Sequence, residues 1–598
     1  MRIAALLLAL AAAPAFALSA ASAAEVGSMA STATDASTAG MGSMTSAAKP
    51  TSTAGAMAMP AMTMPPMPGI YAGVPDRVGA PMFTGYGDHS HKITTANPRT
   101  QAYFDQGIRL LFAFNHAEAI RSFREGARLD PDCAMCWWGT AFALGPNINL
   151  PMQRDAVAPA WAALEKARAL EPKASAEEVA WIEALRARYA QAPAENRHAL
   201  DEAFASAMEK VAALYSTDSD ASVFYAEAMM DTQPWDYWEA DAQTPKGHGA
   251  IITGTLENVL EREPNHPGAL HLYIHAVEAS NTPERAEAAA DKLEPLMPSA
   301  GHIVHMPSHI YYRVGRFEDA AKVNRLAALK DEEYIAACKA QGFYPLAYYS
   351  HNIHFLWTSS EMMGRKKDAE DAAKRLVKAA AAGEPMAANL PPVQLYLFVP
   401  TVTKLRFGDW DGVLKAPRPR DALKIDVAMS LYARGFAFAN KHDYANAMKD
   451  RALLQAMIDR HDFAAIDAFG TPGTMMAKIG VALVDGEIAR NQGKLPEAVT
   501  AFTAARALEK TIPYTEPPYW HEPVSHILGA AMLQAGMAKE AEAVYRESLT
   551  YYRIDGWALF GLAQALDAQG KHDEAAKARA EFDKAWSTAD IKLASSRF

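Results

Sequence analysis

The sequence predicts an all-α protein: a solenoid of antiparallel helix pairs preceded by a disordered tether. Three observations lead to this prediction. Small and aromatic residues return at matching positions of a unit of about 34 residues in much of the chain. A long stretch before the first unit has almost no large aliphatic side chains. Beyond the N-terminal leader, no segment offers roughly 18 unbroken apolar residues, so no membrane span is expected.

Residues 1–24 have the pattern of a secretory signal peptide. Arg2 supplies an early positive charge, the apolar run IAALLLALAAAPAFAL follows, and the small residues SAA stand at 22–24. We therefore expect a mature chain that begins near Glu25 and is periplasmic or secreted. An uncleaved signal that stays as an anchor is the alternative.

Residues 25–86 are predicted to form the disordered tether. They are rich in Ala, Ser, Thr, Gly, Pro and Met, so they cannot offset their own ordering entropy by burial. Thioether side chains suit copper(I), which gives the methionines a ligand role; a low-complexity linker without a ligand is the other interpretation. The methionines are Met29, Met41, Met44, Met57, Met59, Met62, Met64 and Met67.

The repeat occupies the remaining residues, 87–598. In a unit counted from Thr100, positions 4, 8, 20, 24 and 32 hold Tyr103, Gly107, Ala119, Phe123 and Pro131. Later units place Gly486, Ala498 and Phe502, and then Gly529, Ala541 and Tyr545, at positions 8, 20 and 24. The pattern resembles the tetratricopeptide repeat, strongly over 100–145 and 479–590. That resemblance implies a superhelix whose first helices line a concave surface; the spacing itself indicates stacked helical hairpins.

The same numbering brings many histidines into register, in repeats that cover about 267–383. Three consecutive repeats begin at Pro267, Gly301 and Ser350, and their histidines occupy only positions 2, 5 and 9, which share one helix face. Position 12 holds Glu278 in the first of these repeats and Glu361 in the third. The histidines are His271 and His275, then His302, His305 and His309, then His351 and His354.

This alignment predicts a transition-metal site. Neighbouring helices lie roughly 8–10 Å apart, within reach of facing side chains. Like charges depress one another's pKa values, so most of these imidazoles should be neutral and able to act as ligands. Imidazole with carboxylate suits zinc, copper and iron, and we expect the seven histidines with Glu278 and Glu361 to hold such an ion, copper first. Core histidines that bond to backbone or carboxylates are the alternative.

Function follows less directly. The segments HMPSHI and HPGALHLYIHAVE resemble those of exported bacterial tetratricopeptide-repeat proteins. We expect either a metal-dependent enzyme or metal-handling protein, or a scaffold that grips a peptide or protein in a His-lined groove without metal. Catalytic and phosphate-binding motifs are lacking, so the sequence assigns no reaction. The net charge of −11, with both signs interspersed, argues against nucleic acid.

Three further motifs leave alternatives open. Cys133 and Cys136 favour a disulfide in an exported chain, with Cys338 as the remaining thiol, although a CxxC pair can also serve redox chemistry or bind a soft metal. His89 and His91 can add ligands or lie in solvent. The aromatic stretch PWDYWEADAQTPKGHG at 234–249 fits a lid over the groove or a set of core anchors.

Overall fold

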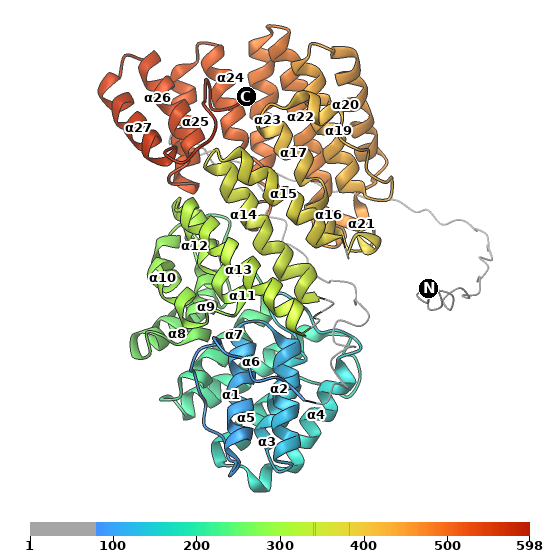
Figure 1. The fold of residues 1–598 in the computed structure, drawn as a ribbon, viewed down its shortest axis with the longest axis vertical. Helices are drawn as coiled ribbons and strands as arrows, with labels where there is room; N and C mark the ends of the chain where they lie inside the picture. The colour runs from blue at the N-terminus through green and yellow to red at the C-terminus, as the bar shows by residue number, and fades with distance from the viewer. Residues whose placement is uncertain (1–78, 339, 341–342, 382) are drawn as a thin grey trace, which may run out of the picture. The chain divides into compact units, whose positions relative to one another are not determined.

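A computed structural model of the chain describes residues 79–598, except 339, 341, 342 and 382. The predicted signal peptide and the methionine-rich tether as far as residue 78 lie outside the described residues. Within them the chain forms α-helices and short 3-10 or π turns, with two isolated β-bridges and no strand. The all-α prediction is confirmed, and Figure 1 shows the helices following one another as antiparallel pairs.

Three groups of helices make up the described chain. The first comprises α1 (Pro98–Phe112), α2 (His116–Leu129), α3 (Ala134–Ala143), α4 (Val157–Ala169), η1 (Glu171–Lys173), α5 (Ala176–Arg186), α6 (Arg197–Leu214), α7 (Ser219–Thr232) and α8 (Gly249–Arg262). The second comprises α9 (Pro267–Val277), η2 (Pro283–Ala286), α10 (Glu287–Leu296), α11 (Gly301–His305), α12 (Pro307–Val314), α13 (Phe317–Cys338), η3 (Pro345–Tyr349), α14 (Ser350–Met362) and α15 (Lys366–Ala380).

The third group completes the repeats. It comprises η4 (Glu384–Met386), α16 (Pro391–Leu397), α17 (Val399–Arg406), α18 (Trp410–Leu414), α19 (Lys424–Asn440), α20 (Tyr444–Asp459), α21 (Ala464–Ala468), α22 (Gly473–Asn491), α23 (Leu495–Glu509), α24 (Val524–Gln534), α25 (Ala538–Tyr551), α26 (Gly556–Ala568) and α27 (His572–Ala585). Among these described helices, none combines the length and the apolar character that a bilayer crossing requires.

Glycines at the places where successive first helices approach each other explain the repeat in terms of packing. A Cβ at Gly529 or Gly561 would lie 2.3 or 2.2 Å from the Tyr545 ring, so that ring fits between two helices only because both residues are glycine. The ring of Phe123 lies between two glycines of α1 and α3 in the same way. The repeat thus reflects aromatic rings that are held between closely approaching first helices.

Local sequence sets the boundaries of the helices that carry histidines. Pro267 occupies the first turn of α9, and the His266 Nδ1 atom caps it by accepting from the Ala269 N–H at 3.2 Å. Pro307 has no N–H to donate, and the first helix of the central repeat is divided there into α11 and α12. The division falls between His305 and His309 without separating them, as the site geometry shows below.

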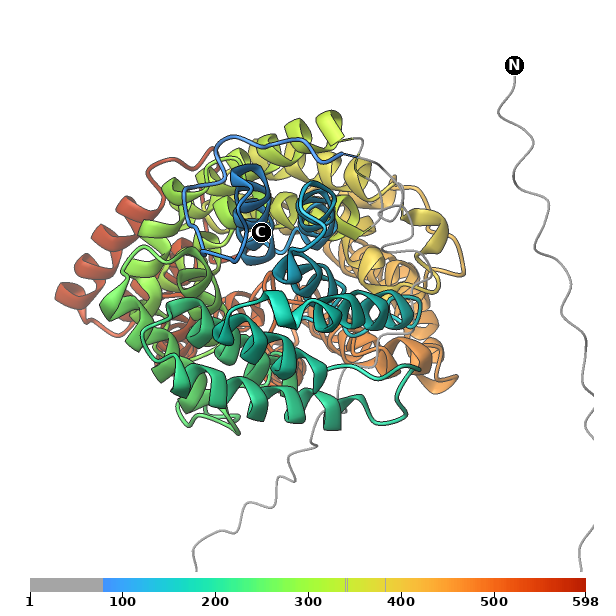
Figure 2. The same cartoon turned by 90° about the horizontal axis from the view of Figure 1, so that it is seen from below.

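The segment 79–97 runs beside the helices before it enters α1, and Figure 2 shows it in blue next to the green helices. Tyr103 donates from its hydroxyl to the Ala80 carbonyl at 2.9 Å, and the Phe83 N–H donates to the Gln106 Oε1 atom at 2.7 Å. Residues 79–86, which composition placed in the tether, therefore pack on the repeats. The packed part of the chain begins earlier than residue 87.

Substitution of the glycines beside Tyr545 tests this packing. We expect Gly529→Ala and Gly561→Ala each to destabilise the fold by about 1–3 kcal/mol, because the added methyl group overpacks the ring. Gly254→Ala in α8 is the matched control: nothing lies within 4 Å of its added Cβ, and alanine favours helix by up to about 1 kcal/mol. Thermal unfolding followed by circular dichroism measures the difference, and equal midpoints for the three variants would contradict the packing role.

Candidate metal centre

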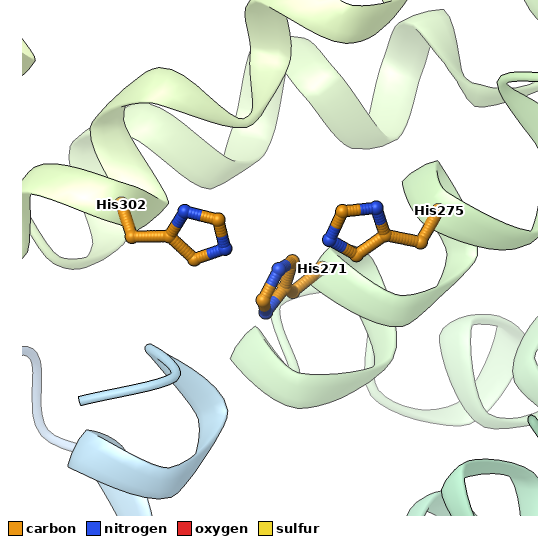
Figure 3. A group of neighbouring side chains, drawn as sticks. All are labelled: His271, His275 and His302. Atoms are coloured by element: carbon orange, nitrogen blue, oxygen red, sulfur yellow. The ribbon is translucent and has the colours of Figure 1, made fainter. Parts of the chain in front are cut away.

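Six of the seven aligned histidines converge on one place. They form two neighbouring triads whose ligand atoms lie within 4.8 Å of one another in each triad. We call the first lobe A (His271, His275 and His302, from α9 and α11) and the second lobe B (His305, His309 and His351, from α11, α12 and α14). Figure 3 shows the three rings of lobe A pointing toward a common space from two helices.

The cluster is buried. The exposed fraction is 0% for His271 and His305 and 4% for His309, while His351 is half-buried. Burial, followed by the neighbouring imidazoles, holds the pKa of His302 and His351 well below the ordinary value, as it does for His271 and His305. These rings are therefore neutral at physiological pH.

In lobe A the acceptors fix the tautomers. The His271 Nδ1–H donates to the Phe112 carbonyl at 2.6 Å, and the His275 Nδ1–H donates to the Glu278 Oε1 atom at 2.8 Å. Each of these neutral rings must then carry its lone pair on Nε2. Both Nε2 atoms are buried without a hydrogen-bond partner, as are both ring nitrogens of His302. Lobe A thus gathers ring nitrogens in the interior, among them two lone pairs with no donor.

In lobe B as well, hydrogen bonds to Nδ1 leave the Nε2 atoms facing inward, and these atoms lie close together. The Asn324 amide nitrogen donates to the Ala320 carbonyl, so its Oδ1 atom accepts from the His305 Nδ1–H at 2.6 Å. The His309 Nδ1–H donates to the Glu278 Oε2 atom at 2.5 Å. The two Nε2 atoms then face each other at 2.9 Å, and the His351 Nε2 atom lies 3.5 Å from that of His309.

Two neutral rings would set lone pair against lone pair here, so the contact is stable only with a proton on one Nε2 atom or a metal ion between them. Nitrogens bound to one tetrahedral metal ion at 2.0–2.1 Å would be about 3.3 Å apart, close to the spacing of lobe B. The i, i+4 pair His305 and His309 therefore keeps a spacing that suits chelation, despite the break at Pro307.

Glu278 links the two lobes. Its two carboxylate oxygens accept from one ring of each lobe, and the Tyr514 hydroxyl adds a third hydrogen bond at 3.2 Å. Burial alone would raise the pKa of Glu278, but His309 and His275 outweigh it and keep the pKa below the ordinary value. Arg313 donates to the backbone carbonyls of Glu278 and Ser280, which fixes the end of α9.

Aromatic side chains enclose the cluster. Phe114 packs against all three rings of lobe A, with centroid distances of 4.5, 5.9 and 5.5 Å, and its backbone is left-handed at a φ of 51°. Phe355 packs against all three rings of lobe B at 5.0, 4.7 and 5.1 Å. Trp235, from the aromatic stretch 234–249, lies edge-on to His275 at 4.9 Å, also with a positive φ.

His354 and Glu361 lie elsewhere. The His354 ring stacks on Trp357 and meets Tyr396, and neither contact belongs to the cluster. Glu361 is buried in the neighbourhood of Arg406, and burial raises its pKa to about 8. The repeat numbering placed His354 and Glu361 on the same face as the other residues. In the structure, the packing of α14 directs both side chains away from the cluster.

Two residues of the site were missed from the sequence. Asn324 stands at position 24, where the clearest repeats carry an aromatic ring and the two flanking repeats carry alanine, and this polar residue was a usable signal. Glu516 comes from the long Pro- and aromatic-rich loop between α23 and α24 and lies 3.8 Å from the His309 Nδ1 atom. Both carboxylate oxygens of Glu516 are buried without a hydrogen-bond partner. No short-range pattern indicated that this loop reaches the cluster.

A second histidine cluster has a different character. Asp220 accepts from His89 at 3.0 Å, from His91 at 2.9 Å and from His266 at 2.9 Å. The remaining nitrogen of His266 already caps α9, so this ring offers no free lone pair. The Asp220 carboxylate, working against burial, raises the pKa of His91 to about 8. These side chains form a satisfied ionic network, next to a cavity of about 300 Å³.

The cysteine pair is resolved as a bond. Cys133 and Cys136 form a disulfide at the start of α3, one of the alternatives that the sequence left open.

Comparison with known proteins yields structural neighbours of low similarity. No protein-family model matches the chain, and no curated protein does. The solved structure of the human IFIT1 dimer with m7Gppp-AAAA aligns at a TM-score of 0.32 and 12% identity, over 85% of this chain and 92% of that chain. Yeast Tom70 aligns at 0.27 and 12%, over 80% and 90%. The Cut9–Hcn1 assembly aligns at 0.24 and 11%, over 69% and 94%. Function rests on the site geometry.

The buried neutral imidazoles give the metal-free protein an acid-sensitive stability. Their folded pKa values lie below the unfolded value of about 6.5, so the stability they contribute is present above that pH and is lost as the pH falls below it, by up to about 1.4 kcal/mol per pH unit for each ring. Unfolding midpoints of chelator-treated protein between pH 7 and 5 should fall less steeply in His271→Leu/His302→Leu. An unchanged slope would contradict the neutral state.

Proposed function

We propose that the chain is an exported helical-repeat protein that binds transition-metal ions through its six clustered histidines. One observation carries the proposal: imidazole lone pairs face one another in the interior, while the opposite nitrogens are held by the Phe112 carbonyl, Glu278 and Asn324. Metal-binding histidines characteristically donate their second N–H to a carbonyl or carboxylate, which fixes the tautomer and orients the ring. A core built only for packing gains nothing from unpaired nitrogens.

Copper is the first candidate metal, with zinc and iron as alternatives. Imidazole nitrogens suit all three ions, and the methionine-rich tether adds soft thioether ligands that favour copper(I). Two observations support export: the signal-peptide pattern of residues 1–24 and the Cys133–Cys136 disulfide, a bond typical of oxidising compartments.

Three histidines per ion suit a metal ion that takes part in chemistry better than one that only stabilises the fold. Closed structural sites usually have four protein ligands, whereas three histidines leave a coordination position open. A bound ion of this kind supplies Lewis-acid or redox chemistry at that position. The protein's part is to orient the rings through Glu278 and Asn324 and to exclude water with Phe114 and Phe355. Both a metal-dependent enzyme and a metal-handling protein fit this arrangement.

Metal analysis of protein purified without chelators tests the proposal. We expect copper, zinc or iron to copurify, and we expect added copper or zinc to raise the thermal midpoint of the stripped protein. His305→Ala/His309→Ala should show a smaller gain because it removes two facing ligands. His354→Ala is the control, since this aligned histidine lies outside the cluster.

Two outcomes would refute the proposal together: negligible metal in the wild-type protein, and no response of its midpoint to added ions. In that case the rival class, a scaffold for a peptide or protein, would remain, and partner capture would be indifferent to chelators.

A second experiment addresses Glu278. In Glu278→Gln the amide has one acceptor oxygen, so only one of His275 and His309 can keep its Nδ1–H bond. The other ring then faces an N–H donor and must move its proton to Nε2, which removes a ligand. We expect metal affinity to fall 10- to 100-fold, as measured by competition with a chromogenic chelator. Glu361→Gln, the other carboxylate at position 12, should leave affinity unchanged; equal effects of both substitutions would contradict the role of Glu278.

A further inference from the structure

Each lobe of the cluster is a complete ligand set. In lobe A, ring centroids of His271 lie 4.8 Å from His275 and 4.9 Å from His302. In lobe B, centroids of His305 lie 4.8 Å from His309 and 4.7 Å from His351. Three imidazoles are the usual protein complement of one metal ion with an open position. Each lobe also has its own phenylalanine packed against all three rings, Phe114 or Phe355.

The two lobes are in contact. His275 and His309 have centroids 5.6 Å apart, and His302 and His305 have centroids 5.8 Å apart. Glu278 orients one ring in each lobe with its two oxygens. Ions in the two lobes would therefore be near neighbours, and two cations side by side need nearby negative charge. Glu278 supplies it through its two oxygens. Glu516 also lies next to His309 and is 3.9 Å from the Arg313 Nε atom, but burial raises its pKa well above the ordinary value, so Glu278 is the charged carboxylate at the centre.

We infer that the cluster is a dinuclear centre that holds one metal ion in each lobe and a small ligand, of one to three atoms, between them. This inference rests on the proposed function and specifies the ligand class of that site. Three imidazoles leave each ion with an open position, and adjacent open positions suit a shared ligand such as hydroxide, azide or dioxygen. The ligand is small because aromatic rings enclose the site: Phe114, Phe355, Trp235 and Tyr348 all contact its imidazoles.

Metal stoichiometry of lobe-specific variants tests the inference. The full mature chain is stripped, loaded with zinc or copper(II) and desalted, and bound metal is counted per chain. His271→Ala/His302→Ala removes two ligands of lobe A, and His305→Ala/His351→Ala removes two ligands of lobe B. We expect each double variant to retain one ion fewer than the wild-type protein, and the quadruple variant to retain two fewer. Circular dichroism confirms that each variant is folded.

Electron paramagnetic resonance detects magnetic coupling between two copper(II) ions, and a variant that is merely less stable does not change this coupling. Two neighbouring copper(II) ions that share a bridging ligand couple magnetically, so the signal of the loaded wild-type protein should integrate to fewer spins than its copper content. Each lobe variant should instead give one spin per bound copper. Azide, as the small-anion probe, should bind the loaded wild-type protein at one per two ions.

The outcomes separate this inference from the proposed function. If either double variant loses all the metal that the quadruple variant loses, a single ion uses both lobes and the dinuclear centre is wrong, although the metal site stands. Spin counts equal to copper content in the wild-type protein would overturn the shared ligand. If wild-type protein and quadruple variant retain the same metal, the proposed function fails as well.

Discussion

The candidate site depends on one energetic constraint: several imidazole nitrogens are buried without a hydrogen-bond donor, which costs folding free energy in the metal-free protein. Burial disfavours the protonated form of His271 and His305, and the Nδ1–H bonds of these two rings direct their lone pairs to Nε2. Three independent acceptors, the Phe112 carbonyl, Glu278 and Asn324, impose the same direction on rings from different helices. Second N–H bonds of this kind are characteristic of metal-binding histidines, and they are the basis of the function proposed above.

The helical repeat is what makes this convergence possible. Positions 2, 5 and 9 of one helix face the same way, and close contact between successive first helices brings three such faces together. The contrast with Asp220 shows that composition alone does not decide the outcome. There, three histidines surround one carboxylate and every interaction is a donor meeting an acceptor. The same residue types therefore form an ionic network in one place and a cluster of buried neutral rings in the other, according to which nitrogens carry protons.

The fold and the six converging histidines were predictable because both follow from spacing within the chain. Glycine at position 8 and alanine at position 20 report local helix contacts, and the histidine register adds only the assumption of a shared face. His354 and Glu361 show where that assumption ends, because the packing of α14 against Tyr396 and Arg406 turns them away. Glu516 was beyond reach for another reason: its loop contacts the cluster from more than 200 residues away in sequence, and no periodicity encodes such a contact.

The loop that carries Tyr514 and Glu516 makes this solenoid different from an array in which each repeat contacts only its neighbours. In an ordinary repeat array each unit touches its neighbours, stability is nearly additive, and units can be trimmed from an end with local consequences. Here the hydroxyl of Tyr514 bonds to Glu278 across 236 positions of sequence. The contact joins the loop between α23 and α24 to the end of α9, so the packing of the central repeats extends beyond their neighbours in sequence. A shortened chain would lose more than its last hairpins, because the missing part also forms one wall of the histidine cluster.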